Sequence, residues 1–207
     1  MQILFVHGMG RTFLSGWPLF FKLRRSGFTS STLGYIVFFE DFASIQARLV
    51  AKISAMADRG EYVLVGHSLG GVLIRAAVND LPPDTRKPKH VFLLGSPISS
   101  PRLAEKFWRN PLYRLFTRDC GLLLASTQRM AEIGSIPSPT TGIAGVSGLS
   151  SKHSPFQGEL NDGLVSLSEV RAAWLTDVVL IPTIHTLLPY DQRVAEIILA
   201  RAAGSGE

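Results

Sequence analysis

Six short apolar runs recur along the chain and constrain its fold more than any other feature. They occupy residues 2–6, 35–39, 62–65, 91–94, 142–146 and 178–181. A strand that is covered on both faces reads as a continuous apolar run, because neither face meets water. The runs therefore predict a mostly parallel sheet of about six strands, with helices packed on both of its faces.

Segments with helical spacing separate these runs. Apolar residues of the segment 42–57 recur at positions that share one helical face, namely Phe42, Ile45, Leu49, Ile53 and Met56. Residues 69–78 form a second predicted helix, which Asn79 and a following pair of prolines end. Residues 188–203 form a predicted closing helix. The alternation of strands and helices indicates the α/β class.

The length of 207 residues suits a single domain that spans residues 1–207. Residues 99–139 interrupt the alternation, and we interpret them as a cap-like or lid-like insertion within this domain. Apolar residues make up 46% of the chain, which excludes a mainly disordered protein. No apolar run approaches the roughly 20 residues of a membrane-spanning helix. The single cysteine, Cys120, excludes an internal disulfide framework and a cysteine-based zinc cluster.

The N-terminal apolar run ends at Gly8 and lacks the basic region and cleavage site of a signal peptide. We therefore expect the first strand to be part of the fold. The same feature predicts a cytoplasmic protein, with attachment to the membrane surface as an option. The net charge of +5 favours an anionic partner, but no nucleic-acid-binding motif accompanies it. Nothing in the sequence indicates a protein partner.

The segment Gly66-His67-Ser68-Leu69-Gly70 carries the pattern G-x-S-x-G between a predicted strand and a predicted helix. A tight turn of this kind holds the central serine in a strained conformation above the sheet edge. It also lies at a helix N-terminus, where free N–H groups favour negative charge. We therefore predict that Ser68 is a nucleophile. The alternative is an ordinary glycine-rich turn between a strand and a helix.

A serine nucleophile needs a base, and His185 is the preferred candidate among the five histidines. It follows the last predicted strand directly, which places it at the same carboxyl edge of the sheet as Ser68. His7 and His67 lie inside turn motifs, and His90 opens a strand. His153 is the second candidate for the base.

The base in turn needs an acid that orients it, and Asp162 lies 23 residues before His185 in the segment Asn161-Asp162-Gly163. Glycine at position 163 allows the backbone to turn beneath the carboxylate. Glu159 and Asp119 are the competing candidates. A plain turn or a helix cap is the alternative role of this tripeptide.

An oxyanion hole requires two backbone N–H donors directed at the tetrahedral intermediate. The residue after the nucleophile, Leu69, supplies one. The loop His7-Gly8-Met9-Gly10 follows the first strand, and Met9 is the candidate for the second donor. The alternative is a glycine-rich turn that only ends the strand.

These segments, in this order along the chain, resemble the α/β-hydrolase superfamily, and within it the compact bacterial serine lipases and esterases. The resemblance covers residues 3–190. It implies a minimal α/β-hydrolase fold in which Ser68 is the nucleophile, Asp162 the acid and His185 the base. It also implies Met9 and Leu69 as the oxyanion donors, and neither an organic cofactor nor a metal. The sequence departs from the secreted lipases in having no leader and no convincing calcium cluster.

The insertion combines basic and apolar side chains between residues 101 and 120. Arg102, Lys106 and Arg109 share one helical face, and we interpret them as a possible rim for the headgroups of an anionic lipid surface. Phe107 and Trp108 are candidate substrate-binding residues. Pro111 predicts that the segment divides into two short helices. The alternative is a surface helix that packs its apolar side on the sheet.

The sequence as a whole predicts a serine hydrolase that cleaves small-molecule carboxylic esters with acyl or lipid-like character. A thioesterase or acyltransferase with the same three residues is the alternative. A non-catalytic binding protein of the same fold is the third hypothesis.

Overall fold

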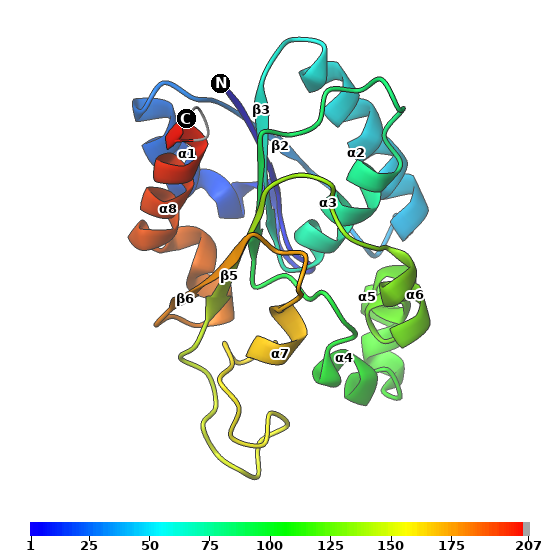
Figure 1. Ribbon diagram of the computed structural model, residues 1–207. Helices are drawn as coiled ribbons and strands as arrows, with labels where there is room; N and C mark the ends of the chain where they lie inside the picture. Colours follow the sequence, from blue (N-terminus) through cyan, green and yellow to red (C-terminus); the bar gives the residue numbers. More distant parts are fainter. Residues whose placement is uncertain (205–207) are drawn as a thin grey trace.

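In the computed structural model, which describes residues 1–204, six parallel strands form one sheet in the order β2-β1-β3-β4-β5-β6 (Figure 1). The strands are β1 (Gln2–Val6), β2 (Thr29–Leu33), β3 (Tyr62–His67), β4 (His90–Leu94), β5 (Thr140–Gly145) and β6 (Asp177–Ile181). This arrangement confirms the predicted α/β class and the parallel sheet covered by helices.

The second strand differs from its prediction. Residues 35–39, expected as a strand, form a turn in which the Phe39 N–H donates to the Ile36 carbonyl at 2.9 Å. The strand is instead the segment Thr29–Leu33, at the edge of the sheet. Most of its side chains are only partly buried, so threonine and serine suit it and no apolar run marks it. The apolar run at 35–39 is divided between core and surface, because Tyr35 and Val37 are buried whereas Ile36 and Phe39 are exposed.

Two hydrophobic clusters hold the helices against the two faces of the sheet. The strand residues Leu4 and Leu64 pack with α2 (Phe42–Ala57) and α3 (Leu69–Asn79). Their neighbours Phe5 and Val65 point to the other face and pack with α1 (Trp17–Arg25) and α8 (Gln192–Gly204). Both faces are therefore buried, as the continuous apolar runs predict.

The predicted helices at 42–57 and 69–78 are present as α2 and α3. The predicted closing helix is divided into η2 (His185–Tyr190) and α8, since Pro189 and Asp191 interrupt it. Helix α1 was not predicted. Its buried residues are only Leu19, Phe20 and Leu23, and exposed aromatic residues beside them hide the helical period.

The insertion forms α4 (Arg102–Phe107), α5 (Pro111–Leu124) and α6 (Thr127–Glu132). Helix α4 ends before Pro111 and α5 begins there, with the Asn110 side chain accepting from the Leu112 N–H at 2.9 Å. Buried residues of α5 and α6, among them Cys120 and Met130, join the cluster of α2 and α3. The insertion therefore packs beside α2 and α3 (Figure 1).

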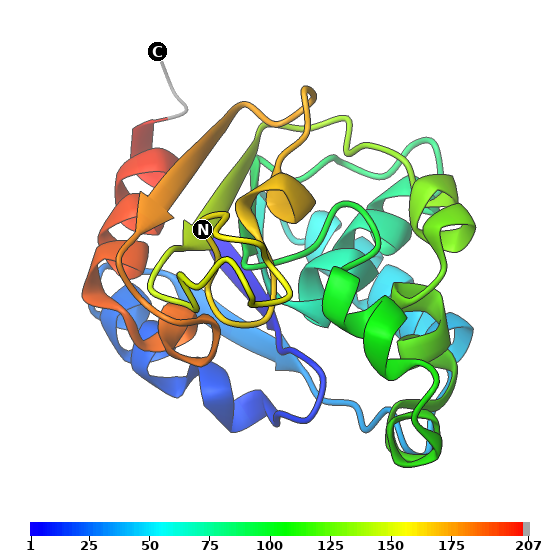
Figure 2. The same cartoon turned by 90° about the horizontal axis from the view of Figure 1, so that it is seen from below.

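A different segment lies across the carboxyl edge of the sheet. The loop between β5 and α7 (Leu167–Val170), coloured yellow, crosses the centre of the view from below (Figure 2). A short helix, η1 (Phe13–Gly16), follows β1 on the side of α1.

The connections that leave β1 and β3 turn to opposite faces of the sheet. The chain after β1 forms α1 on one face, whereas the chain after β3 forms α3 on the other. Neighbouring strands with diverging connections leave a crevice at their carboxyl ends, where ligands bind in open α/β sheets. Gly8 and Ser68 lie at the ends of these two strands, so the topology makes both of them candidate site residues.

Candidate active site

Ser68 occupies a strained turn between β3 and α3. Its backbone angles are φ 54° and ψ −123°, a region that residues other than glycine rarely adopt. A Cβ on Gly70 would lie 2.1 Å from the Val6 carbonyl oxygen, and one on Gly66 would lie 2.5 Å from the Gly71 Cα. The glycines of the G-x-S-x-G pattern therefore allow the turn to pass close to β1 and to its own helix.

The structure brings Asp162 and His185 together. The His185 Nδ1 lies 2.6 Å from the Asp162 Oδ2, and both side chains are buried. The other carboxylate oxygen accepts from the N–H groups of Leu164 and Val165 at 2.9 and 2.8 Å. A carboxylate only accepts, so the neutral imidazole carries its proton on Nδ1 and leaves Nε2 as an acceptor. This is the tautomer that a general base requires.

The end of β4 links this pair to the serine. The Ser68 N–H donates to the Leu94 carbonyl at 2.9 Å. A Cβ on the next residue, Gly95, would lie 3.0 Å from both the Asp162 Oδ2 and the His185 Nδ1. Within residues 1–204, the Ser68 hydroxyl forms no hydrogen bond. Hydrogen bonds between a nucleophile and its base are often long in free enzymes and tighten around substrate.

His67 is a contact of His185 that the sequence interpretation missed. Its Nε2–H donates to the His185 carbonyl at 3.0 Å, and the two ring centroids are 4.8 Å apart. Burial, and then the nearby charge of His185, lower the pKa of His67 to about 3. His67 therefore stays neutral and holds the backbone of His185. Its position next to Ser68 at the end of a central strand was the available signal.

The two candidate oxyanion donors have free N–H groups. In the described residues, neither the Met9 N–H nor the Leu69 N–H has a hydrogen-bond acceptor. Gly8 lies against the nucleophile turn, because a Cβ on it would lie 3.0 Å from the Ser68 Cβ. The Tyr35 hydroxyl donates to the His7 carbonyl at 2.5 Å and so holds the start of this loop.

The competing acids and bases have other contacts. Glu159 pairs with Arg102 at 2.8 Å, and Asp119 pairs with Arg129 at 2.8 Å. His153 lies exposed in the loop after β5. His90 begins β4, at the amino edge of the sheet, and its Nε2 lies 2.9 Å from the Thr141 hydroxyl.

The candidate substrate-binding residues of the insertion have contacts within α4 and α5. The Phe107 ring faces Tyr113 at 6.2 Å, and the Arg114 guanidinium lies 4.8 Å from the Trp108 ring centroid. None of these contacts joins them to Ser68 or His185. Of the three basic residues on the predicted helical face, Lys106 and Arg109 are exposed. Arg102 instead pairs with Glu159 and Glu169.

Two general properties complete the description of residues 1–204. No group of three or more histidine, cysteine, aspartate and glutamate side chains in this part of the chain is placed to hold a metal ion. No helix there has both the length and the hydropathy to cross a bilayer.

Comparisons with known proteins give one family and one fold. A lipase of Bacillus licheniformis has a TM-score of 0.74 at 18% identity, with 96% of this chain and 90% of that chain covered. A metagenomic carboxyl esterase has a TM-score of 0.73 at 16% identity, covering 98% and 75%. A thioesterase of the prodiginine pathway in Streptomyces coelicolor has a TM-score of 0.59 at 14% identity, covering 99% and 90%.

No curated protein sequence matches the chain significantly. The model of the alpha/beta hydrolase family matches residues 3–201, which is nearly the whole sequence. The chain therefore belongs to the alpha/beta hydrolase family.

Proposed function

We propose that the protein is a serine hydrolase that cleaves carboxylic esters through an acyl-enzyme on Ser68. The observation that carries the proposal is the buried contact of 2.6 Å between His185 and Asp162, at the sheet edge where Ser68 ends β3. A buried carboxylate with a single imidazole partner has the arrangement of an orienting acid and a base. The likeness to a lipase and a carboxyl esterase supports the choice of ester substrates.

In the first half of the reaction, the His185 Nε2 accepts the proton of the Ser68 hydroxyl as the oxygen attacks the ester carbonyl. Asp162 stabilises the imidazolium that forms, and the two backbone N–H groups on its other oxygen hold the carboxylate in place. The free N–H groups of Met9 and Leu69 donate to the oxyanion.

Collapse of the tetrahedral intermediate breaks the bond to the alcohol, which leaves with the proton from His185. Water then attacks the acyl group and gives a proton to His185, and the second collapse returns that proton to Ser68. The atoms balance without a cofactor, because the alcohol leaves with the proton that Ser68 gave up, and water supplies both the hydroxyl of the acid and the proton that restores Ser68.

A thioesterase is the second candidate, since two thioesterases have the same fold at TM-scores of 0.59 and 0.62. A thioester would follow the same steps with a thiol as the leaving group. An acyltransferase would replace water by an alcohol acceptor. For the acyl part of the substrate, we propose acyl chains or other lipid-like groups.

Labelling with a fluorophosphonate tests the nucleophile. We expect the wild-type protein to be labelled, Ser68→Ala to lose the label, and Ser44→Ala, on the exposed side of α2, to keep it. Equal labelling of Ser68→Ala would contradict the proposal. Absence of labelling in the wild type would favour a non-catalytic protein of this fold. A panel of p-nitrophenyl esters, acyl thioesters and alcohol acceptors then separates the three reactions by their relative rates.

A further inference from the structure

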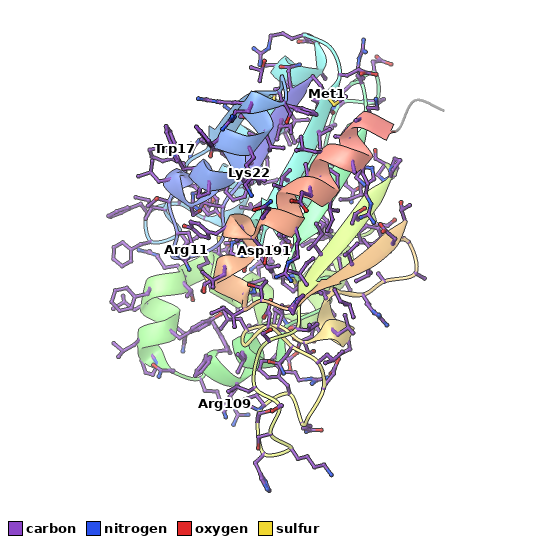
Figure 3. The ribbon with its side chains drawn as sticks, turned by 90° about the vertical axis from the view of Figure 1, so that its left-hand side faces the viewer. Met1, Arg11, Trp17, Lys22, Arg109 and Asp191 are labelled. Atoms are coloured by element: carbon purple, nitrogen blue, oxygen red, sulfur yellow. The ribbon has the colours of Figure 1, made fainter. Side chains whose placement is uncertain are left out.

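Helix α1 shows aromatic residues to solvent. Leu19, Phe20 and Leu23 face the sheet, whereas Trp17 and Phe21 on the opposite side are 61% and 58% exposed. Phe13 in η1 precedes them at the same spacing of four residues and is also exposed. A surface helix normally turns polar residues outward, so a stripe of exposed aromatic side chains marks an interaction surface. Trp17 stands at the outer margin of the molecule in Figure 3.

The stripe continues onto two further segments. Phe13 and Ile36 line one cavity of about 340 Å³, which joins η1 to the turn after β2. In that turn the Phe38 ring lies 5.0 Å from Phe39 and 6.3 Å from Phe116 of α5. Phe39 and Phe116 are 77% and 60% exposed. We call η1–α1, the turn at 36–39 and the outer side of α5 together the aromatic surface.

The charge of these segments is mainly positive. Residues 11–39 carry four basic and no acidic residues, and α5 carries Arg114 and Arg118 with one acidic residue, Asp119, in a chain with 21 basic and 16 acidic residues. Arg24 and Arg25 follow Trp17 and Phe21 on the same exposed side of α1. The Arg25 guanidinium lies 5.6 Å from the Phe21 ring centroid, and that of Arg118 lies 5.8 Å from the Phe38 ring centroid.

The acids that border this surface already have partners. Glu40 pairs with Arg48, and Asp119 pairs with Arg129. Asp41 accepts from the Ser44 N–H and caps α2. These three acids at the edge of the surface are therefore already paired or hydrogen-bonded. Exposed aromatic residues surrounded by lysine and arginine have the chemistry of a segment that lies in the interface of an anionic membrane.

We propose that the aromatic surface docks the protein on the surface of anionic lipid bilayers. Trp17, Phe21 and Phe39 enter the interfacial region, and the arginines beside them bind the lipid phosphates. The cavity between Phe13 and Ile36 also touches His7, whose neighbour Gly8 lies against Ser68. Docking therefore brings the edge of the sheet that carries Ser68 close to the lipid. The proposal does not depend on hydrolysis and extends to the Ser68→Ala protein.

The sequence predicts Arg102, Lys106 and Arg109 as the rim for an anionic lipid surface. Arg102 forms ion pairs with Glu159 and Glu169, and these contacts hold α4 in place. We therefore place the main lipid contact on the aromatic surface.

Flotation with vesicles tests the docking. The full chain is mixed with vesicles of phosphatidylcholine alone, or of equal parts phosphatidylcholine and phosphatidylglycerol. We expect binding to the mixed vesicles at least tenfold stronger than to the neutral ones. We also expect it to weaken between about 0.1 M and 1 M salt, as the screening length falls from about 10 Å to 3 Å. Absence of binding to the mixed vesicles at low salt would overturn the proposal.

Two pairs of variants locate the surface. Trp17→Ser with Phe21→Ser removes aromatic groups that are exposed, and Arg24→Glu with Arg25→Glu reverses the charge beside them. Each basic residue near such a membrane contributes about 1 kcal/mol, so the charge variant should lose at least tenfold in binding. The matched controls are Leu180→Ser on β6, and Arg86→Glu with Lys87→Glu in the exposed loop before β4. Unchanged circular dichroism and melting temperature establish that each variant is folded.

The result that supports the proposal is loss of vesicle binding in both α1 variants and retention in both controls. Equal loss in the controls would overturn it, since general charge or hydropathy would then explain the binding. Sedimentation equilibrium gives the other test. A dimer that Trp17→Ser with Phe21→Ser dissociates would assign the surface to a second copy of the chain and overturn the membrane proposal.

Discussion

Replacement of Asp162 by asparagine tests the proposed mechanism most directly, because the structure dictates how the new amide must lie. One oxygen of Asp162 accepts from the N–H groups of Leu164 and Val165 at 2.9 and 2.8 Å. An asparagine must place its oxygen there, since its NH₂ group would otherwise face two donors. Leaving two buried donors unpaired costs about 1–3 kcal/mol for each.

The NH₂ group then takes the position of the oxygen that lies 2.6 Å from the His185 Nδ1. An NH₂ group donates, so Nδ1 must become the acceptor and the ring proton moves to Nε2. His185 in this tautomer cannot accept a proton from Ser68. Substitutions of this type reduce kcat about 10⁴-fold, which corresponds to about 5.5 kcal/mol in the activation free energy.

The assay measures two quantities for each variant: kcat/KM for a p-nitrophenyl ester and the rate of fluorophosphonate labelling. Asp119→Asn is the matched control, since it removes the same charge from a carboxylate that contacts Arg129 and the Phe42 N–H. We expect Asp162→Asn to keep its melting temperature within a few degrees while it loses activity. Activity within tenfold of the wild type, or an equal loss in Asp119→Asn, would refute the assignment of Asp162 as the orienting acid.

Three further predictions concern stability and reactivity. The pKa of His67 is about 3 in the folded protein and near 6.5 when unfolded, so the unfolded chain binds more protons between these values. Stability should therefore fall by about 1.4 kcal/mol for each pH unit between pH 6.5 and pH 3, and urea unfolding of His67→Gln should lack this component. Gly70→Ala should destabilise the fold by about 2 kcal/mol or more, because its Cβ would lie 2.1 Å from the Val6 carbonyl oxygen; an unchanged urea midpoint would contradict this. Burial raises the pKa of the Cys120 thiol to about 12, so iodoacetamide at pH 8 should modify it only after denaturant is added, as mass spectrometry can measure.

The central strands could be predicted from the sequence because a strand buried on both faces consists of a continuous run of apolar residues. The edge strand Thr29–Leu33 has no such apolar run, since its partly exposed side chains are mostly threonine and serine. The apolar run at 35–39 resembles a buried strand because the exposed Ile36 and Phe39 are as apolar as the buried Tyr35 and Val37. Sequence periodicity reports burial, and it misleads wherever apolar residues are exposed.

The candidate site divides in the same way. The spacing of glycines around Ser68 is a local geometric requirement, and the position of His185 follows from the order of strands. The contact of His67 with the His185 carbonyl joins residues 118 positions apart and depends on how two distant loops pack against each other. No local sequence pattern determines that packing. The sequence already favours Asp162 over Glu159 as the acid, and the structure adds that Glu159 pairs with Arg102.

The contacts of Arg102 change how the insertion can move. Its guanidinium pairs with Glu159 and Glu169, and its backbone N–H donates to the Glu169 carboxylate at 2.7 Å. Glu159 and Glu169 flank Asp162 in the chain, so the first turn of α4 is fastened to the segment that carries the proposed acid. A displacement of α4 would pull directly on the partner of His185. Changes in the length of the chain next to Arg102 should therefore impair the proposed hydrolysis.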